Sequence, residues 1–178
     1  MKILKQVICL LFNGLVFAAC SSTADRPPVV KNFDVGKYLG KWYEVARFDF
    51  YFEKNMDHTT AQYSLNEDGT VRVVNRGYNY AKMKWKEAVG KAKFAGDRTE
   101  ADLKVSFFGP FYGAYRVIAL DPAYQYALVA GKNKEYLWIL SRQTTIPLEI
   151  KASYLKIAED AGFDTSKLIW VNHHPPTE

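Results

Sequence analysis

The chain has 178 residues, and its 24 Lys and Arg against 19 Asp and Glu give a formal net charge of +5. This length fits one domain with a sizeable core. The basic residues are scattered through strand-like segments and form no long block, so the charge disfavours nucleic-acid binding. A basic surface beside anionic lipid head groups and a solvated surface without a preferred partner both fit this charge.

The first residues have the pattern of a secretory signal. Two basic residues, Lys2 and Lys5, precede an apolar run from Val7 to Ala19. This run is shorter than the roughly 20 apolar residues that a membrane-spanning helix needs. A basic start, a short apolar segment and small residues at its end predict a signal peptide over residues 1–19, which takes no part in the fold.

The end of this signal, Phe17-Ala18-Ala19-Cys20, resembles the lipobox of bacterial lipoproteins, although Leu is commoner where Phe17 stands. The resemblance implies that Cys20 is the lipid anchor, because several acyl chains would hold the protein on a membrane. Ser21, in place of an Asp, implies sorting to the outer membrane. The alternative is an ordinary secreted protein that is cut near Ala19.

The cysteines limit the possible chemistry. Cys9 lies within the signal, so Cys20 is the cysteine that remains after processing. Such a chain forms no intramolecular disulfide, even in an oxidising periplasm. It also carries no Cys-based metal site and no catalytic thiol apart from Cys20.

The processed chain divides into two parts. Residues 20–32 are polar and proline-bearing after Cys20, and are expected to form the lipidated N-terminus and a linker. At about 3.3 Å per residue this linker would span up to roughly 40 Å. The folded domain is expected over residues 33–178.

Short strand-like runs follow one another at intervals near ten residues, with turn signals such as Glu67-Asp68-Gly69 between them. A segment from Pro147 to Ala161 instead repeats apolar residues at helical spacing and is followed by Gly162. The pattern predicts an all-β fold, an eight-stranded antiparallel up-and-down β-barrel with one C-terminal α-helix packed outside and a short ninth strand. The expected strands are Lys41–Phe50, Thr59–Leu65, Thr70–Tyr78, Trp85–Phe94, Asp102–Phe107, Ala114–Leu120, Tyr126–Ala130, Tyr136–Ser141 and Leu168–Val171.

Alternation within the strands predicts which side chains point into the barrel. Small residues, Ala88, Gly90 and Ala92, alternate with mostly charged ones and are expected to face inward. An eight-stranded barrel can be filled by side chains or can hold one small ligand, and composition does not choose between these. The runs Ala127–Ala130 and Tyr136–Leu140 are apolar on both faces, so the helix is expected to cover them.

Three stretches resemble the lipocalin family. They are Gly40-Lys41-Trp42-Tyr43-Glu44, the segment Val117–Ala127 and Tyr136–Arg142. The second departs from the family in reading Leu120-Asp121-Pro122 where Thr-Asp-Tyr is more usual. The resemblance extends from about Phe33 to Val171. Together with the lipobox, it makes the chain most similar to bacterial outer-membrane lipocalins, which are relatives of apolipoprotein D.

The resemblance implies both structural and ligand-binding roles. Trp42 would close the narrow end of the barrel, with the Arg142 guanidinium over its ring, and Gly40 would permit the approach into the first strand. The expected ligand is a fatty acid, lysophospholipid or phospholipid, bound without a cofactor or metal, at the outer membrane facing the periplasm. The expected cavity residues, placed by alternation and by the family's interior positions, are Ala61, Tyr63, Val73, Asn75, Ala88, Gly90, Val105, Phe107, Tyr115, Val117, Val129, Tyr136 and Trp138.

Two other classes of function are alternatives to a ligand-binding barrel. An enzyme is disfavoured, because no Gly-x-Ser-x-Gly occurs and His173-His174 are expected in a solvated tail. His58 is expected in a loop after the first strand, with a haem site there a minor alternative. The aromatic stretch from Phe107 to Tyr112 spans a turn and motivates the second class, a barrel with a solid or minor cavity that acts as a homodimer or protein-interaction module.

Overall fold

A computed structural model describes residues 26–174. The expected signal peptide, the Cys20 anchor and the first residues of the linker lie outside this range. Neither of the α-helices in the described part of the chain is long and apolar enough to cross a membrane.

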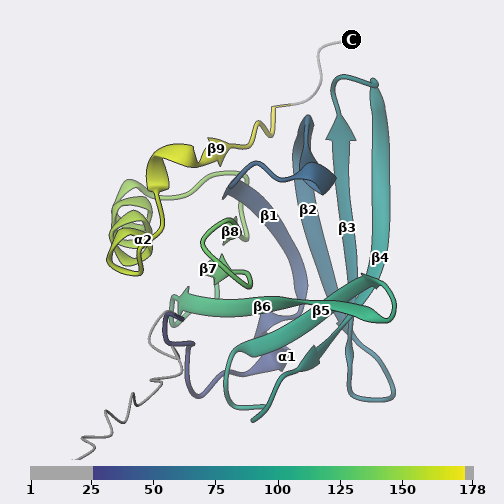
Figure 1. The fold of residues 1–178 in the computed structure, drawn as a ribbon, viewed down its shortest axis with the longest axis vertical. Coiled ribbons are helices and arrows are strands. Elements are labelled where there is room, and N and C mark those ends of the chain that lie inside the picture. Colours follow the sequence, from purple (N-terminus) through teal and green to yellow (C-terminus); the bar gives the residue numbers. More distant parts are fainter. Residues whose placement is uncertain (1–25, 175–178) are drawn as a thin grey trace, which may run out of the picture.

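One antiparallel sheet of nine strands closes on itself, because β1 pairs with both β8 and β2 while β9 lies outside on β1. The expected eight-stranded barrel with a ninth strand and an outer helix is therefore confirmed (Figure 1). The strands are β1 (Gly40–Arg47), β2 (Met56–Leu65), β3 (Val71–Asn79), β4 (Lys84–Phe94), β5 (Asp102–Phe108), β6 (Phe111–Leu120), β7 (Tyr126–Ala130), β8 (Leu137–Ser141) and β9 (Ile169–Trp170).

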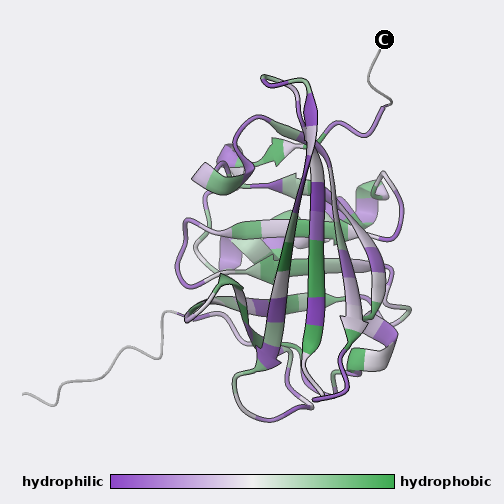
Figure 2. Ribbon diagram, turned by 90° about the vertical axis from the view of Figure 1, so that its right-hand side faces the viewer, coloured by the Kyte–Doolittle hydropathy of each residue, from purple (hydrophilic) through white to green (hydrophobic). Residues whose placement is uncertain are grey.

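The expected strand ends differ from the observed ones where tertiary pairing overrides local pattern. β6 begins at Phe111, earlier than the expected Ala114, because Phe111 pairs with Phe108 across the β5–β6 turn. β1 ends at Arg47, and the chain then forms a loop with a short 3-10 turn, η2 (Tyr51–Glu53). Figure 2 shows hydrophilic and hydrophobic residues alternating along the strands, as expected for strands with one face in the barrel and one face in water.

A short helix, α1 (Val35–Tyr38), lies at the end of the barrel where β1 begins, here called the closed end (Figure 1). Asp34 caps it by accepting from the backbone N–H of Gly36 at 2.8 Å. The next residues enter β1 through Gly40, which has φ +94°, and an added Cβ there would lie 3.3 Å from Nη1 of Arg142. Both facts explain a glycine at this position.

The helix α2 (Leu148–Asp160) covers β7 and β8 from outside (Figure 1). Its Tyr154 and Ala158 are buried in one cluster with Leu128, Leu137 and Ile139, and the Tyr154 hydroxyl donates to the carbonyl of Tyr126 at 2.8 Å. This cluster is the apolar cover that the two doubly apolar strands were expected to need. Gly162 follows the helix with φ +81°.

The described part of the expected linker is not free of the barrel. The Val30 N–H donates to the carbonyl of Val117, and its own carbonyl accepts from Ala101, both at 2.9 Å. Val30 also packs against the buried core. The chain therefore contacts the barrel already at Val30, three residues before the expected start of the domain at residue 33. Its backbone N–H and carbonyl pair with the carbonyl of Val117 and the N–H of Ala101, so these polar groups are satisfied.

The C-terminal residues correct two expectations about histidines. Val171 donates to the carbonyl of Val45, and Nε2 of His173 lies 2.9 Å from the carbonyl oxygen of Glu44, so His173 is half-buried on β1 and is not part of a solvated tail. His58 lies within β2 at a register shift, with φ +54°, and not in a loop. Its N–H donates to the carbonyl of Asn172, which ties the bulge to the C-terminal segment.

Replacing Trp42 tests the closed end. Trp42 is fully buried, so Trp42→Ala should lower the free energy of unfolding by about 3–5 kcal/mol through lost burial and a cavity. Urea denaturation followed by circular dichroism measures this. The exposed Gln62 lies on the neighbouring strand, and Gln62→Ala should change stability by less than about 0.5 kcal/mol. A similar, small effect of both changes would contradict the assigned role of Trp42.

Acidification should loosen the C-terminal segment. Burial, aided by the nearby His58 and Lys41, lowers the pKa of His173 below its usual 6.5, while the Glu44 carbonyl and Asp57 oppose this. Because the folded-state pKa is depressed, docking is fully stabilised above pH 6.5 and weakens as the pH falls through that value. Hydrogen exchange at the Val171 amide, corrected for intrinsic rates, should therefore speed up on acidification.

The two adjacent histidines provide the control. His173→Gln should abolish the pH dependence of Val171 protection, whereas His174→Gln, at an exposed position, should preserve it. If the protection of the Val171 amide in the parent protein did not change as the pH falls below 6.5, the titration of His173 would not control the docking of the C-terminal segment.

Candidate functional site

The barrel interior gathers most of the expected cavity residues on one face of the sheet. Strand pairing sets Val73 beside Gly90, Val117 beside Val129, and Val129 beside Trp138. Five of the expected residues are buried: Ala61, Tyr63, Val73, Val117 and Val129. Seven are partly buried: Asn75, Gly90, Val105, Phe107, Tyr115, Tyr136 and Trp138. The interior is therefore mainly apolar, with amide and phenol groups among the side chains.

Ala88 differs from the rest of the expected set. β4 pairs with β5 only from Lys91 onward, so its first half has a neighbour on one side, β3. Ala88 is exposed there, above the part of the wall that encloses the interior. Alternation predicts the face of β4 on which Ala88 lies. It does not predict where β5 stops pairing with β4.

Gly90 is small for a different reason from the one expected. An added Cβ would lie 2.7 Å from the carbonyl oxygen of Ser106 and 2.8 Å from the Phe107 ring. A larger residue than glycine would therefore collide with the Phe107 side chain, which packs over Gly90. Because Phe107 fills this space, the glycine leaves no room for a ligand at this point.

Three tyrosines form a hydrogen-bonded chain near the closed end. The Tyr115 hydroxyl lies 2.7 Å from that of Tyr38 and 2.9 Å from that of Tyr63. Burial raises the pKa of Tyr115 well above its ordinary value, and the neighbouring Tyr38 and Tyr63 add to this. All three therefore stay protonated and neutral, which suits an otherwise apolar floor. The alternation pattern found Tyr63 and Tyr115 but not Tyr38, which comes from α1.

An ionic cluster of Glu44, Arg47 and Glu53 lies inside the opposite half of the barrel. Arg47 is 2% exposed, and its Nε lies 3.6 Å from a Glu44 oxygen and 3.5 Å from a Glu53 oxygen. Glu44 also accepts from the Thr59 hydroxyl at 2.9 Å. The residue pattern did not predict this cluster, although Glu44 lies two residues after Trp42 in β1 and so points to the same side of the strand. A bulge between Glu44 and Ala46 then turns Arg47 inward.

The two carboxyls of this cluster compete for one guanidinium. Burial raises the pKa of Glu44 well above its usual range and the Glu53 charge adds to the shift, while Arg47 opposes it. Burial also raises the pKa of Glu53. Burial therefore disfavours a negative charge on both carboxyls at once, and Arg47 is the one positive charge beside them.

Exposed aromatic side chains surround the end opposite α1, here called the mouth. Tyr51 and Phe52 in the β1–β2 loop are 86% and 69% exposed, and Phe108 and Phe111 at the β5–β6 turn are 67% and 80% exposed. The rings of Phe52 and Phe108 approach to 6.2 Å between centroids. The expected aromatic turn thus lies beside a second aromatic loop.

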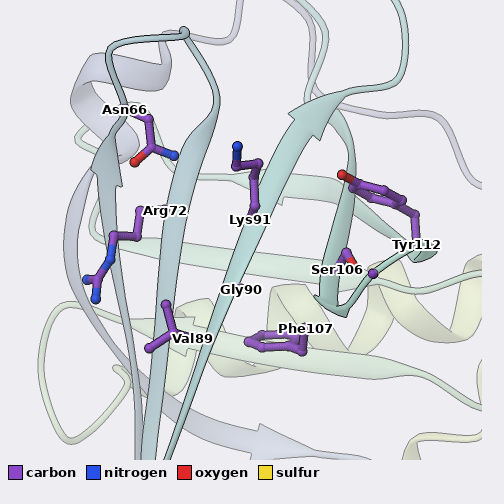
Figure 3. Close-up of a pocket in the computed structure, with 9 residues that line it drawn as sticks. Asn66, Arg72, Val89, Gly90, Lys91, Ser106, Phe107 and Tyr112 are labelled. Carbon is purple, nitrogen blue, oxygen red and sulfur yellow. The ribbon is translucent and has the colours of Figure 1, made fainter.

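An open groove of about 530 Å³ lies where β4 and β5 stop pairing. Figure 3 shows Lys91 and Val89 on one side of it and Ser106, Phe107 and Tyr112 on the other. Its lining combines the outward side chains of Arg72 and Lys91 with inward-facing Gly90 and Phe107. The groove thus lies in the wall of the barrel between β4 and β5 and is not the enclosed interior.

The Arg142 guanidinium completes the site by sealing the closed end. It lies 3.9 Å from the centroid of the Trp42 ring, which is the arrangement that the family resemblance implied. It also donates to the carbonyls of Lys37, Leu39 and Lys41 at 2.8–2.9 Å. The arrangement leaves the barrel interior between a sealed floor and the ionic cluster beneath the mouth.

Comparison with known proteins agrees with this architecture. The family described as Lipocalin-like domain matches residues 33–173. The chain is 52% identical over 172 residues to the outer membrane lipoprotein Blc of Citrobacter freundii, covering 96% of this chain and 97% of that protein. It is 37% identical over 151 residues to apolipoprotein D of Rattus norvegicus, covering 80% and 78% of the two chains.

A solved structure shows the same fold at lower sequence identity. Insecticyanin from the tobacco hornworm Manduca sexta superposes with a TM-score of 0.69 at 20% identity, covering 84% of this chain and 86% of that one. The closed barrel, the sealed end with Arg142 over Trp42, and the match over residues 33–173 lead to one conclusion. The chain belongs to the lipocalins, a family of binding proteins and not of enzymes.

Proposed function

We propose that this lipocalin binds lipids in its barrel and is held at the outer membrane by acyl chains on Cys20, facing the periplasm. It would store or transport fatty acids, lysophospholipids or phospholipids for maintenance of the envelope. The proposal is supported by the relative at 52% identity, which is named an outer membrane lipoprotein. The observation that carries it is the apolar interior, closed at one end and bordered by aromatic residues at the other.

The interior side chains suit an acyl chain. Val73, Val105 and Val129 face the same space from three strands, and the tyrosines below them are neutral. Burying some 300 Å² of hydrocarbon would contribute roughly 7 kcal/mol at about 25 cal/mol per Å², before the cost of association. Micromolar binding corresponds to about 8 kcal/mol net, so contacts with the polar head group would have to add to this gain, and a cavity that is already formed would reduce the cost of association.

The position of the N-terminus agrees with a tether. Val30 is hydrogen-bonded to Val117 and Ala101 at the closed end, and residues 21–29 separate it from Cys20. This segment can extend to roughly 30 Å. The barrel is therefore tethered from the end that does not exchange ligand, and the mouth stays free.

A second candidate function is a dimer or protein-interaction module at the outer membrane with a solid or minor cavity. The exposed rings of Tyr51, Phe52, Phe108 and Phe111 favour it, because apolar groups of this size gathered at one end commonly mark a contact surface. Light scattering across a concentration series distinguishes the two, since a constant monomer mass would exclude the dimer.

A paired substitution on β5 tests lipid binding. Val105 points into the barrel and its neighbour Lys104 points out. Val105→Trp should fill the interior and weaken binding of a lysophospholipid about tenfold or more, by overlap with the acyl chain, while Lys104→Trp leaves it unchanged. Native mass spectrometry of the delipidated processed chain, carrying Cys20→Ser, measures the bound fraction during titration.

Saturable one-to-one binding that is lost only in Val105→Trp would support the proposal. Absence of binding to the folded, delipidated parent protein would count against it and favour the protein-contact alternative. Equal loss in both variants would indicate a binding site outside the barrel.

A further inference from the structure

The outer side of the barrel wall over β3, β4 and β5 is basic. Four exposed side chains point outward from these neighbouring strands and form what is here called the basic face: Arg72, Lys91, Lys93 and Lys104. The residues next to them in sequence, Val73, Ala92 and Leu103, are buried and point into the barrel. Strand pairing therefore gathers four positive charges on one side of the molecule.

The four charges are arranged at a cost to the fold. Arg72 lies directly opposite Lys91, and Lys93 lies directly opposite Lys104. Like charges at such positions destabilise a sheet. Within the described residues a carboxylate pairs with Lys91 alone of the four, namely Asp68 at 3.1 Å. The stability of the barrel therefore does not explain this arrangement, whereas a negatively charged partner would.

Basic residues on the other side of the barrel are paired with acidic ones. The helix α2 lies outside β7 and β8, and β8 is across the barrel from β4 (Figure 1). On α2, Lys156 lies 2.9 Å from Asp160, and in the following 3-10 turn η3 (Thr165–Lys167), Lys167 lies 3.3 Å from Asp164. An anionic surface would therefore attract the basic face more strongly than the α2 side.

The N-terminal segment leaves the barrel beside the basic face. Arg26, at the start of the described chain, lines a small pocket of about 120 Å³ together with Lys104 and Arg116. Residues 21–25 separate Arg26 from Cys20, and this segment can extend to roughly 20 Å. Acyl chains on Cys20 would therefore hold this side of the barrel close to the membrane.

The basic face also carries groups that suit lipid head groups. The groove between β4 and β5 is lined here by Arg72, Lys91 and Tyr112 (Figure 3). Tyr112 is 41% exposed, and Nζ of Lys93 lies 4.5 Å from the centroid of its ring. Ser106 lines the same groove, and its buried Oγ has no hydrogen-bond partner within the described residues. Phosphate oxygens can accept from such donors, and tyrosine is common where proteins meet a membrane interface.

We propose that the basic face docks the barrel on its side against the anionic head groups of the membrane that holds Cys20. The inference rests on the proposed lipid anchor, which supplies the membrane, and it adds the surface that contacts this membrane. Each basic residue close to such a surface strengthens binding, and four residues on one side orient the barrel. The α2 side then faces away, and the mouth lies beside the membrane surface and not against it.

Vesicle binding tests the docking without the anchor. The processed chain with Cys20→Ser is sedimented with vesicles of equal parts phosphatidylglycerol and phosphatidylcholine. Lys93→Gln with Lys104→Gln should lower its partition coefficient about tenfold or more, because two charges are lost at the contact. Lys156→Gln with Lys167→Gln removes the same charge from the α2 side and should change the coefficient less than about twofold, because charges more than about 10 Å from the surface are screened.

Thermal unfolding is the control for folding. The midpoint of the Lys93→Gln, Lys104→Gln variant should be unchanged or higher than that of the parent protein, because a repulsive cross-strand pair is removed. Loss of vesicle binding in this variant is then a loss of the contact and not of the fold.

Three results would overturn the inference. Equal loss of binding in the two double variants would show that overall charge drives it. Equal partition of the parent protein onto pure phosphatidylcholine vesicles would show that anionic head groups are not recognised. A parent protein that binds lysophospholipid but does not partition onto the mixed vesicles would remove the docking alone. Partition without any lysophospholipid binding would instead remove the proposed lipid binding and leave the docking in place.

Lysine labelling locates the contact in the anchored protein. The lipidated chain is held on the outside of the mixed vesicles or in detergent, treated with a water-soluble amine reagent and analysed by mass spectrometry. Modification of Lys93 and Lys104 should be several-fold slower on the vesicles, whereas Lys156 and Lys167 should react equally in both preparations. Equal rates at all four lysines in the two preparations would contradict docking on this side of the barrel.

Discussion

The contact between Arg142 and Trp42 is the constraint on which the other features depend. One guanidinium covers the indole ring and hydrogen-bonds the backbone carbonyls that lead from α1 into β1. A planar group with five donors can do both at once, which a Lys ammonium cannot. This seal fixes which end of the barrel is closed and, with α1 and Tyr38, gives the interior a floor. In the proposed function, the opposite end is then the route for the ligand.

The interior changes character along its axis. Near the floor, neutral tyrosines hydrogen-bond one another among apolar residues. Beneath the mouth, Arg47, Glu44 and Glu53 lie close together and have little contact with solvent. Low local dielectric makes each of these polar groups sensitive to its partners. A lipid with its tail on the floor and its polar group near the mouth would match this gradient.

The sequence predicted the strands well because alternation reports which face of a strand is buried, and that signal survives in a single chain. It also predicted the helix that covers β7 and β8. The pattern did not predict the direction of a side chain where that direction depends on a strand far away in the sequence. Ala88 is exposed because β5 has already turned away, and Arg47 points inward because of a bulge. His173 was mistaken for part of a tail because its partner, the Glu44 carbonyl, leaves no mark in the residue pattern.

In the proposed function, a lipid tail occupies the barrel between the closed end and the ionic cluster. Methyl NMR of the processed protein, with a fatty acid that carries a nitroxide near its methyl end, tests this occupancy. With the tail in the barrel, broadening should be strongest at the interior methyl groups of Val73, Val117 and Val129 and weaker at Val89 and Leu65, which are exposed. Broadening confined to exposed methyl groups, with sharp interior signals, would contradict it.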